Sequence, residues 1–392
     1  MQAARLAMQV PTIASNLTNA HVLEVFTKYR DLISLPVLEG ETPIGLISRN
    51  IFMSQMSKPY YRELYEKKTC IAFMDKAPLI VDSKISVEKL AELAVESGDK
   101  TLADGFLIVD DARFAGLGSG LDLMRKMVEL QTEKNHQVMQ SIDYASTIQQ
   151  AMLSTSDTAM KAMLPDACLT WQPRDIVGGD FYHFESFEHG WFGALADCTG
   201  HGVPGAFLTV IASSALQQAL HQFGPADPAR LMAEVNRKIK ARLGQSARGR
   251  LSESDDGMDA TFFWFDKTTR NLTSASARMP LHYFLPGTAE VVSIPGERMG
   301  IGYVDTDEHT VWRNTITQLP TNSILFGATD GLTDQIGGTK NIAFGKQRLR
   351  NHLLQHKQLS MEKLVASLLH ELHDYQGQHQ RRDDLTCFGF RL

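Results

Sequence analysis

Residues 191–206 read Trp-Phe-Gly-Ala-Leu-Ala-Asp-Cys-Thr-Gly-His-Gly-Val-Pro-Gly-Ala, and the fold can be worked out from this stretch. Its first part, 191–196, is an unbroken apolar run that is typical of a buried strand. Asp197 ends this run, and a glycine-rich loop leads to a helical pattern at 204–222. The stretch therefore predicts a carboxylate held at the end of a buried strand, directly before a helix.

Three further aspartates stand in comparable settings. Asp180 follows two glycines, Asp330 follows the apolar run 324–328, and Asp383 precedes the apolar run 385–390. A single Asp-Gly pair is usually a turn, so the prediction depends on the order and context of all four acids. Carboxylates at the ends of adjacent strands can converge, and they repel each other unless cations neutralise them. Because Mn²⁺ and Mg²⁺ prefer oxygen ligands, these acids and Asp197 predict a metal site.

The C-terminal half contains many strand-like runs and few helical patterns. Strands are predicted at 191–196, 260–265, 281–284, 323–327 and 386–391, and helices at 204–222, 228–243 and 361–375. This balance favours an α+β domain over regular βαβ winding.

Composition narrows the class of protein. The 392 residues predict two or three domains, and the net charge of −6 argues against broad nucleic-acid binding, so we expect no nucleic-acid partner. The charge-free stretch 198–226 contains histidines, glutamines and glycines, which suit a core helix better than a membrane span. Four scattered cysteines without C-x-x-C spacing fit a reducing, cytoplasmic location.

The N-terminal third contains an internal repeat. Residues 35–48 align without gaps on residues 106–119, so that Gly45 falls on Gly116 and Ser48 on Ser119. Each copy predicts a strand, an acidic turn, a second strand and a helix, with another helical segment upstream. The repeat indicates a small α/β module that occurs twice; the alternative is two unrelated units that happen to align.

A long helix is predicted between the repeat and the C-terminal half. The boundaries are 1–122 for the repeat module, 123–155 for the linking helix and 156–392 for the C-terminal domain. A short heptad-like seam within the helix could form a homodimer, or the helix could pack on its own chain. The seam consists of Asn135, Val138, Ile142, Ala145, Gln149 and Met152.

The repeat resembles a tandem CBS-domain pair. Residues 116–122, Gly-Leu-Gly-Ser-Gly-Leu-Asp, match the nucleotide signature of that family. The resemblance implies an adenine nucleotide, with Gly116 and Ser119 at a phosphate and Asp122 on the ribose hydroxyls. In the first copy Ile51 replaces the acid, so only one site looks competent. A purely structural pair is the alternative.

The acidic motifs resemble the metal-dependent protein phosphatase (PPM) family, in its bacterial SpoIIE-type branch. The matching strings are G-G-D-F-Y, D-x-x-G-H-G-x-P-G-A, T-D-G-L-x-D and D-D-x-T, in that order over 145–392. The resemblance implies two antiparallel sheets packed face to face, with helices outside.

The resemblance also implies two bound Mn²⁺ or Mg²⁺ ions. Asp197 would bridge the ions, with the carbonyl of Cys198 and Asp180 on the first ion, and Asp330 and Asp383 on the second. A water between the ions would attack the phosphorus of phosphoserine or phosphothreonine.

Three neighbouring residues qualify this assignment. Asp334 could contact a third, weaker ion. Arg174 could steer phosphate, but pairing with Asp175 on the surface is the favoured interpretation. Cys198 stands where the family usually has glycine, and a carbonyl ligand tolerates that change. A thiol-phosphatase reaction at Cys198 is disfavoured, because Pro204 occupies the position where that loop needs arginine.

The predicted function is that of a serine/threonine protein phosphatase regulated by the CBS-like module. By resemblance, its substrate is a small phosphorylated bacterial regulator, such as an anti-sigma-factor antagonist of the STAS type, in a partner-switching pathway. In that branch the helix around 141–153 helps to order the metal site. The alternatives are a catalytically silent nucleotide-sensing scaffold that binds a regulatory partner, and an enzyme for a phosphorylated small molecule.

Overall fold

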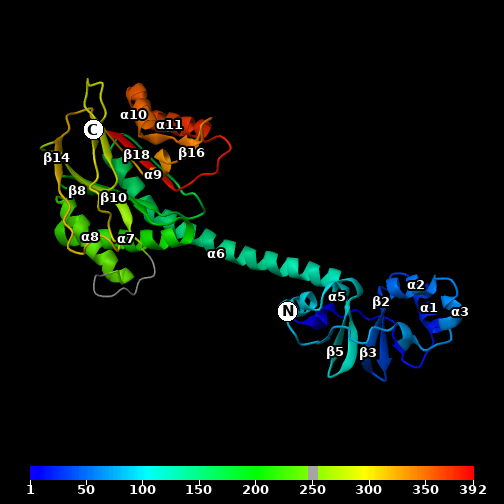
Figure 1. The fold of residues 1–392 in the computed structure, drawn as a ribbon. Coiled ribbons are helices and arrows are strands. Elements are labelled where there is room, and N and C mark those ends of the chain that lie inside the picture. Colours follow the sequence, from blue (N-terminus) through cyan, green and yellow to red (C-terminus); the bar gives the residue numbers. More distant parts are fainter. Residues whose placement is uncertain (246–254) are drawn as a thin grey trace. The chain divides into compact units, whose positions relative to one another are not determined.

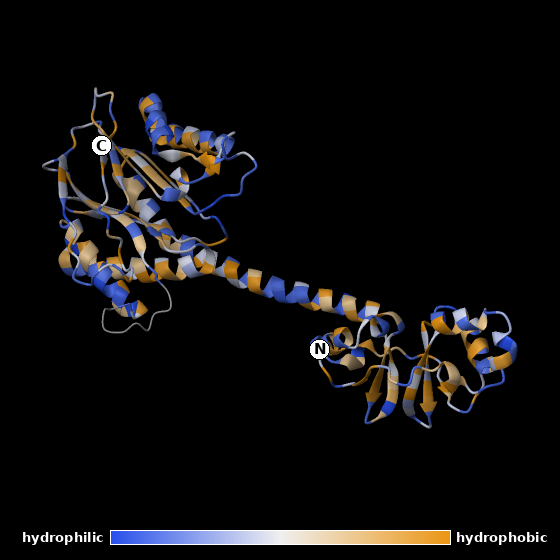
Figure 2. Cartoon of the chain, in the orientation of Figure 1, coloured by the Kyte–Doolittle hydropathy of each residue, from blue (hydrophilic) through white to orange (hydrophobic). Residues whose placement is uncertain are grey.

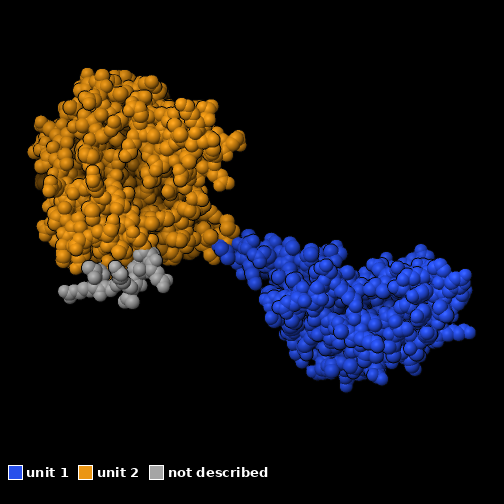
Figure 3. Space-filling model, viewed as in Figure 1, with its two compact units in different colours: residues 1–138 blue, residues 139–392 orange. Residues whose placement is uncertain are grey.

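The computed structural model describes residues 1–245 and 255–392. The chain divides into two compact units, 1–138 and 139–392, which are coloured separately in Figure 3. We describe each unit by itself.

Unit 1 contains two three-stranded sheets, β1-β2-β3 and β4-β5-β6 (Figure 1). The first copy consists of η1 (Ala3–Leu6), β1 (Ile13–Ala14), α1 (Asn19–Lys28), β2 (Ser34–Glu39), β3 (Thr42–Ser48), α2 (Arg49–Met56) and α3 (Tyr61–Tyr65). The second copy consists of η2 (Cys70–Phe73), β4 (Ile80–Asp82), α4 (Val87–Glu96), α5 (Asp99–Asp104), β5 (Phe106–Asp110) and β6 (Arg113–Gly118).

The structure confirms the internal repeat. In each copy the first strand pairs in parallel with the second, and the second pairs antiparallel with the third. The ladder shifts register between Val37 and Leu38 in the first copy and between Ile108 and Val109 in the second. These are equivalent positions in the gapless alignment, so even the local irregularity is repeated.

The helix α6 (Gly120–Met163) contains the predicted linking segment and extends beyond it at both ends. The boundary between the two units falls inside this helix, after Val138. Figure 2 shows that the middle of α6 is largely hydrophilic, whereas the strands of both units are mostly hydrophobic. Much of the helix is therefore solvated, and its apolar residues gather nearer its ends.

Unit 2 contains two five-stranded antiparallel sheets, ordered β14-β11-β10-β9-β8 and β13-β12-β15-β18-β7. The first sheet consists of β8 (Asp180–Phe187), β9 (Gly190–Cys198), β10 (Met258–Asp266), β11 (Asn271–Ala277) and β14 (Thr315–Gln318). The second consists of β7 (Asp166–Gln172), β12 (Leu281–Phe284), β13 (Val292–Ile294), β15 (Ile324–Ala328) and β18 (Leu385–Arg391). A small hairpin joins β16 (Ile336–Gly337) to β17 (Ile342–Ala343).

Aromatic side chains from the two sheets pack against each other. The ring of Trp191 on β9 lies 5.0 Å from that of Phe390 on β18, and Phe184 on β8 lies 5.6 Å from Phe388. All four residues are buried, which confirms the prediction of a buried strand for Trp191. Edge-to-face contacts of this kind favour one register of the sheets, because the ring edge must meet the ring face.

The helices of unit 2 are α7 (Gly202–Phe223), α8 (Pro228–Leu243), α9 (Asp330–Thr333), α10 (Gly345–His356) and α11 (Met361–Gln376). The helix α7 is long and apolar enough to cross a membrane by composition. It packs on α8, β8 and β9 and buries Leu208, Leu216 and several alanines. The helix is therefore part of the core of unit 2, as predicted for a core helix.

Candidate functional site

Two of the predicted acids stand side by side at one end of the first sheet. Asp180 begins β8, Asp197 lies near the end of β9, and the two residues are directly paired across the ladder. On the other side of β9, Asp259 of β10 is paired with Asp197. An antiparallel ladder brings the end of one strand beside the start of the next, and this register aligns three carboxyl groups.

The second sheet contributes hydroxyl groups to the same place. Asp180 is fully buried, and its Oδ2 accepts hydrogen bonds from Thr329 Oγ1 at 2.8 Å and Thr386 Oγ1 at 2.7 Å. Thr329 follows β15 and Thr386 lies in β18. Its other oxygen, Oδ1, is buried without a hydrogen-bond partner among the residues that the structure describes. A buried carboxylate oxygen in this condition needs a proton or a cation.

The remaining two acids come from adjacent strands of the second sheet. Asp330 follows β15 and Asp383 precedes β18, and these strands pair antiparallel. Gly331 permits their approach, since a Cβ there would lie 1.9 Å from the carbonyl oxygen of Asp384. This contact requires glycine at position 331. From the sequence alone, the same Asp-Gly pair is equally compatible with an ordinary turn.

Asp384 is a site residue that the sequence did not single out. Its buried carboxylate accepts hydrogen bonds from the backbone N–H groups of Arg174 and Gly179, both at 2.6 Å. Gly179 approaches Cys198 closely, because a Cβ there would lie 2.9 Å from the Cys198 carbonyl oxygen. Asp384 therefore fixes the loop that leads to Asp180. The same loop packs against the carbonyl of Cys198, which is the predicted metal ligand.

Burial and mutual repulsion oppose the charged forms of these acids. Burial raises the pKa of Asp180, and the nearby Asp384 and Asp383 add to the increase, against the two threonine hydrogen bonds. Burial also raises the pKa of Asp197, followed by repulsion from Asp180, Asp330 and Asp383. The pKa of the Cys198 thiol is raised by burial and then by the negative charges of Asp197, Asp180 and Asp384, which disfavours a thiolate.

A divalent cation fits this donor set. The five predicted ligands lie at or next to strand ends of the two packed sheets. The acids repel each other, and Asp180 Oδ1 is buried without a hydrogen-bond partner in the described chain. Within residues 1–245 and 255–392, no three His, Cys, Asp or Glu side chains form a ready-made metal cluster. Ion binding would therefore require carboxylate side chains to move, in the direction that charge neutralisation favours.

A cavity of about 240 Å³ opens beside these acids. Asp197 and Asp330 line it, together with Asp334, the residue predicted from the sequence as a possible contact of a third ion. Asp259 and Arg278 also line it, and neither was predicted. Burial raises the pKa of Asp259 to about 6, although the positive charge of Arg278 lowers it. Asp259 could have been found from its position directly before the predicted strand 260–265, two residues after Gly257.

The structure changes the interpretation of Arg174. Asp175 pairs with His201, whose Nδ1 lies 2.7 Å from the Asp175 carboxylate, so the expected pair between Arg174 and Asp175 is wrong. The Arg174 side chain donates instead to the carbonyl of Arg382 at 3.1 Å. The reason is that the Arg174 backbone is anchored on Asp384, which turns its side chain along the 382–384 segment.

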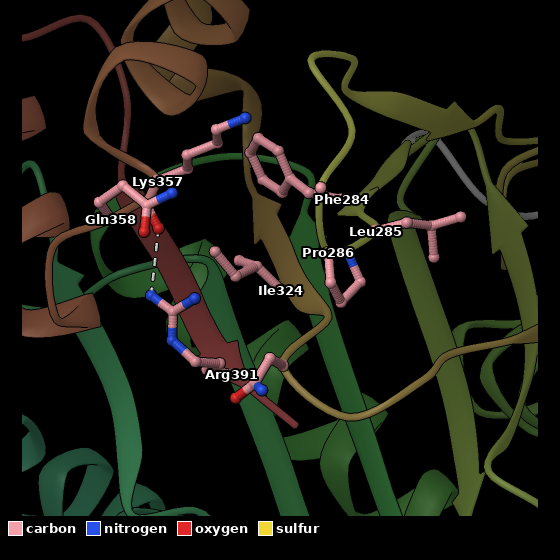
Figure 4. Close-up of a pocket in the computed structure, with 9 residues that line it drawn as sticks. Phe284, Leu285, Pro286, Ile324, Lys357, Gln358 and Arg391 are labelled. Carbon is pink, nitrogen blue, oxygen red and sulfur yellow. Dashed lines mark hydrogen bonds between the residues drawn. The ribbon is translucent and has the colours of Figure 1, made fainter.

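A larger cavity of about 400 Å³ lies elsewhere in unit 2 (Figure 4). Phe284, Ile324 and Pro286 form its apolar part. Its basic groups already have partners: Arg391 donates to two backbone carbonyls and to a carboxylate, and Lys357 Nζ donates to a carbonyl at 2.7 Å. This cavity contains none of the predicted acids, so the acidic cavity is the candidate site.

The predicted nucleotide residues of unit 1 are engaged with their own chain. Ser119 Oγ lies 2.6 Å from the Asp122 carboxylate and accepts from the Asp122 N–H at 3.0 Å, as a helix cap does. The space beside Gly116 is filled by Ala7, only 2.8 Å from where a Cβ would be. A cavity of about 490 Å³ is lined instead by residues of both copies, among them Ser48 of the first and Lys100 of the second.

Comparison with known proteins supports the motif-based resemblance. The family model described as Stage II sporulation protein E (SpoIIE) matches residues 188–392. The structure of the SiaA-PP2C domain of Pseudomonas aeruginosa is 34% identical; the match covers 66% of this chain and 98% of that one, with a TM-score of 0.59. No curated protein matches the chain.

Two further solved structures are more distant. The PP2C phosphatase domain of SpoIIE from Bacillus subtilis is 16% identical over 58% of this chain and 63% of that one, with a TM-score of 0.46. The RsbU and RsbW domains of a Mycobacterium tuberculosis protein are 15% identical over 58% and 60%, with a TM-score of 0.47. The family model and the close match to the SiaA domain together show that this chain belongs to the SpoIIE family and that unit 2 is a PP2C-type protein phosphatase domain.

Proposed function

We propose that the chain is a Mn²⁺- or Mg²⁺-dependent phosphoserine/phosphothreonine phosphatase. The observation that carries the proposal is Asp180: it is fully buried, it faces other acids, and its Oδ1 has no hydrogen-bond partner in the described chain. A silent scaffold would gain nothing from this arrangement, because burying repelling carboxylates destabilises the fold unless a cation joins them.

The residues of the site have two roles: some would bind the ions, and others orient the metal-binding groups. Asp197, Asp180 and the Cys198 carbonyl would hold one ion, and Asp197, Asp330 and Asp383 the other. Bound ions supply an activated water and neutralise the phosphoryl oxygens. Thr329 and Thr386 orient the Asp180 carboxylate through its Oδ2. Asp384 orients the backbone that leads into Asp180.

The proposal is tested by hydrolysis of p-nitrophenyl phosphate with and without millimolar Mn²⁺. We expect metal-dependent activity in the wild type and a loss of roughly a hundredfold or more in Asp197→Ala, which removes the bridging carboxylate. Asp266→Ala, at an acid in the last pair at the opposite end of the β9–β10 ladder, is the matched control and should keep wild-type activity. Metal-independent hydrolysis, or full activity in Asp197→Ala, contradicts the proposal.

We infer that the substrate is a small phosphorylated bacterial regulator of the STAS type, in a partner-switching pathway. This inference rests on family membership, and the cavity of about 240 Å³ adds that a phosphorylated side chain could enter it. The measurement is release of phosphate from a phosphorylated STAS-domain protein, compared with a free phosphorylated metabolite such as phosphoserine. A preference for the metabolite would favour the alternative of a small-molecule phosphatase.

The helix α6 supplies a physical route for regulation. Gln149 is buried, donates to the carbonyl of Gly178 at 2.7 Å and accepts from its N–H at 3.1 Å. Gly178 stands two residues before Asp180 in the same loop. We propose that a signal in unit 1, received by a CBS-like pair that binds an adenine nucleotide, alters α6 and thereby the metal affinity.

Homodimerisation and a cytoplasmic location complete the proposed function. Val138, Ala145 and Met152 of the predicted seam are exposed, whereas Gln149 is buried against its own chain and is not available to a partner. The seam is therefore interrupted at that position. Analytical ultracentrifugation of the full chain tests the dimer.

The four cysteines, all within the described residues, are free thiols, which supports the proposal of a reducing, cytoplasmic compartment.

A further inference from the structure

An arginine with an unusual backbone conformation faces the acidic cavity. Arg278 directly follows β11 and has a φ of +59°, in the left-handed region that non-glycine residues seldom adopt. Its side chain lines the cavity together with Asp197 and Asp330. Strained residues of this kind cost about 1–3 kcal/mol and persist only where the surroundings hold them.

The surroundings of Arg278 do hold its backbone. The Arg278 N–H donates to the Glu297 carbonyl at 2.7 Å. Gly296 packs directly on it, since a Cβ there would lie 2.7 Å from the Arg278 carbonyl carbon. Arg278 also forms an isolated β-bridge with Ala260 of β10, the strand that pairs with β11. The side chain is therefore aimed at the cavity by a conformation that costs free energy.

The guanidinium is oriented, but its outer nitrogens are only loosely engaged. Nε donates to the Arg298 carbonyl at 3.0 Å, and the guanidinium lies 4.6 Å from the centre of the Tyr303 ring. These two contacts fix the plane. Nη1 lies 3.7 Å from Asp259 and Nη2 lies 3.8 Å from Asp305, which are ion-pair distances beyond hydrogen-bond range. The forked pair of donors is thus pre-oriented and can take a better acceptor.

We propose that Arg278 binds the phosphoryl oxygens of the substrate in this cavity, exchanging its long ion pairs for two charge-assisted hydrogen bonds. The proposal rests on the proposed phosphatase function. A guanidinium matches two oxygens of a phosphate in a planar fork, which an ammonium group cannot do. Asp259 keeps the guanidinium in place while no substrate is bound.

The charge of the cavity makes such a group necessary. Asp197, Asp259, Asp330 and Asp334 line it and would repel a phosphate dianion. Arg278 and Lys346 are the positively charged side chains among its described lining residues, and His282, which also lines it, is neutral because burial lowers its pKa to about 4. Lys346 belongs to the first turn of α10. Arg278 is the one held by backbone strain and by a carbonyl, so we assign it the phosphate.

The test compares the two positions that flank β11, Arg270 before it and Arg278 after it. Arg278→Gly removes the guanidinium and relieves the positive φ, so it should fold at least as well as the wild type. Arg270 stands at the opposite end of β11 and also has a positive φ, of 56°, but its Nε donates to the Leu319 carbonyl, outside the acidic cavity. Arg270→Gly is therefore the matched control. Arg278→Lys keeps the charge and removes the fork.

The measured quantities are the inhibition constant of inorganic phosphate and the KM for p-nitrophenyl phosphate, in saturating Mn²⁺. We expect Arg278→Gly to raise both by about tenfold, the net loss when two charge-assisted hydrogen bonds that had replaced two long ion pairs are removed, and Arg278→Lys to raise them less. The Mn²⁺ midpoint should stay within about twofold of the wild type. A rise of less than about threefold in Arg278→Gly, or an equal rise in Arg270→Gly, overturns the proposal.

A second measurement separates this proposal from the phosphatase activity itself. Binding of inorganic phosphate to the full chain in Mg²⁺ is followed by the line width of its ³¹P resonance, which needs no turnover. If the wild type hydrolyses nothing, the proposed function fails, but broadening by the wild type and by Arg270→Gly, and none by Arg278→Gly, still supports the phosphate contact. Equal broadening by all three chains contradicts it.

Discussion

Neighbouring aspartates at positions 383 and 384 have different tasks in this fold. Asp384 is buried and satisfies two backbone N–H groups, whereas Asp383 is half-buried and accepts from the Asp384 N–H at 2.9 Å. The sequence D-D could not separate them, because both residues belong to the same motif. Their side chains point to different partners only once β18 is paired.

We predict opposite phenotypes for alanine at these two positions. Asp384→Ala leaves the buried Gly179 N–H and the part-buried Arg174 N–H without acceptors, so the free energy of unfolding should fall by about 1–3 kcal/mol. Asp383→Ala should keep most of the stability and lose the Mn²⁺-dependent activity. Urea unfolding and p-nitrophenyl phosphate hydrolysis of both variants check this. Equal loss of stability in the two variants would refute the division of roles.

His282 makes the stability of unit 2 depend on pH. It is buried on β12 beside Ser293, and its pKa is lowered to about 4 by burial and by the positive charges of Arg350 and Lys346. The unfolded histidine titrates near ~6.5, so between pH 6.5 and 4 the unfolded chain binds the extra proton. The folded state therefore loses stability as the pH falls through this window, by up to about 3 kcal/mol.

The corresponding variant is His282→Asn, whose amide can replace Nδ1 at Ser293 but does not titrate. We expect the difference in unfolding free energy between pH 7 and pH 4.5 to shrink by about 2 kcal/mol relative to the wild type. The exposed His309, changed to asparagine, is the control and should leave the difference unaltered. An unchanged pH dependence in His282→Asn would show that the buried imidazole is not the cause.

At the scale of elements, α6 contacts the loop that leads to Asp180 through the side chain of Gln149. Both functional groups of the Gln149 amide bond to Gly178, and its Nε2 also lies 3.2 Å from Thr209 of α7. Gln149→Glu removes the donor and keeps the shape. Because the loop before Asp180 then loses a fixed contact, we expect the Mn²⁺ midpoint of activity to rise by roughly tenfold.

The neighbouring residue on the same helix provides the comparison. Gln150 is exposed and lies 3.4 Å from Ser146 within its own helix, so Gln150→Glu adds the same charge without touching the loop. Its Mn²⁺ midpoint should match the wild type. Similar midpoints in Gln149→Glu and the wild type would rule out α6 as the route to the metal site.

At the scale of the whole molecule, the question is whether unit 1 controls unit 2. Both units have their own cores, and α6 is continuous through their boundary. Deletion of residues 1–120 should then change the Mn²⁺ dependence of hydrolysis, because the helix loses its N-terminal support. The full chain and the truncated chain are compared over the same Mn²⁺ titration. Identical curves would mean that unit 1 does not act through the metal site.

The sequence by itself determined what is local and periodic. The helix α8 and the strand β12 have the predicted bounds, and the repeat, the α+β class and the four ordered acids all follow from residue patterns. Hydrophobic periodicity and strand-end acids are properties of neighbouring residues, so they can be read before folding. Strands that were not predicted, such as β11 and β14, are polar or short and gain stability only from their partners.

Only the tertiary structure decided which side chains meet. Asp180 is bound by threonines 149 and 206 residues away, and Asp384 accepts from residues more than 200 positions earlier. Asp259 and Arg278 enter the site because sheet register, not sequence spacing, brings β10 and the end of β11 to the cavity. Such contacts depend on strand order and pairing, and local propensity carries no information on either.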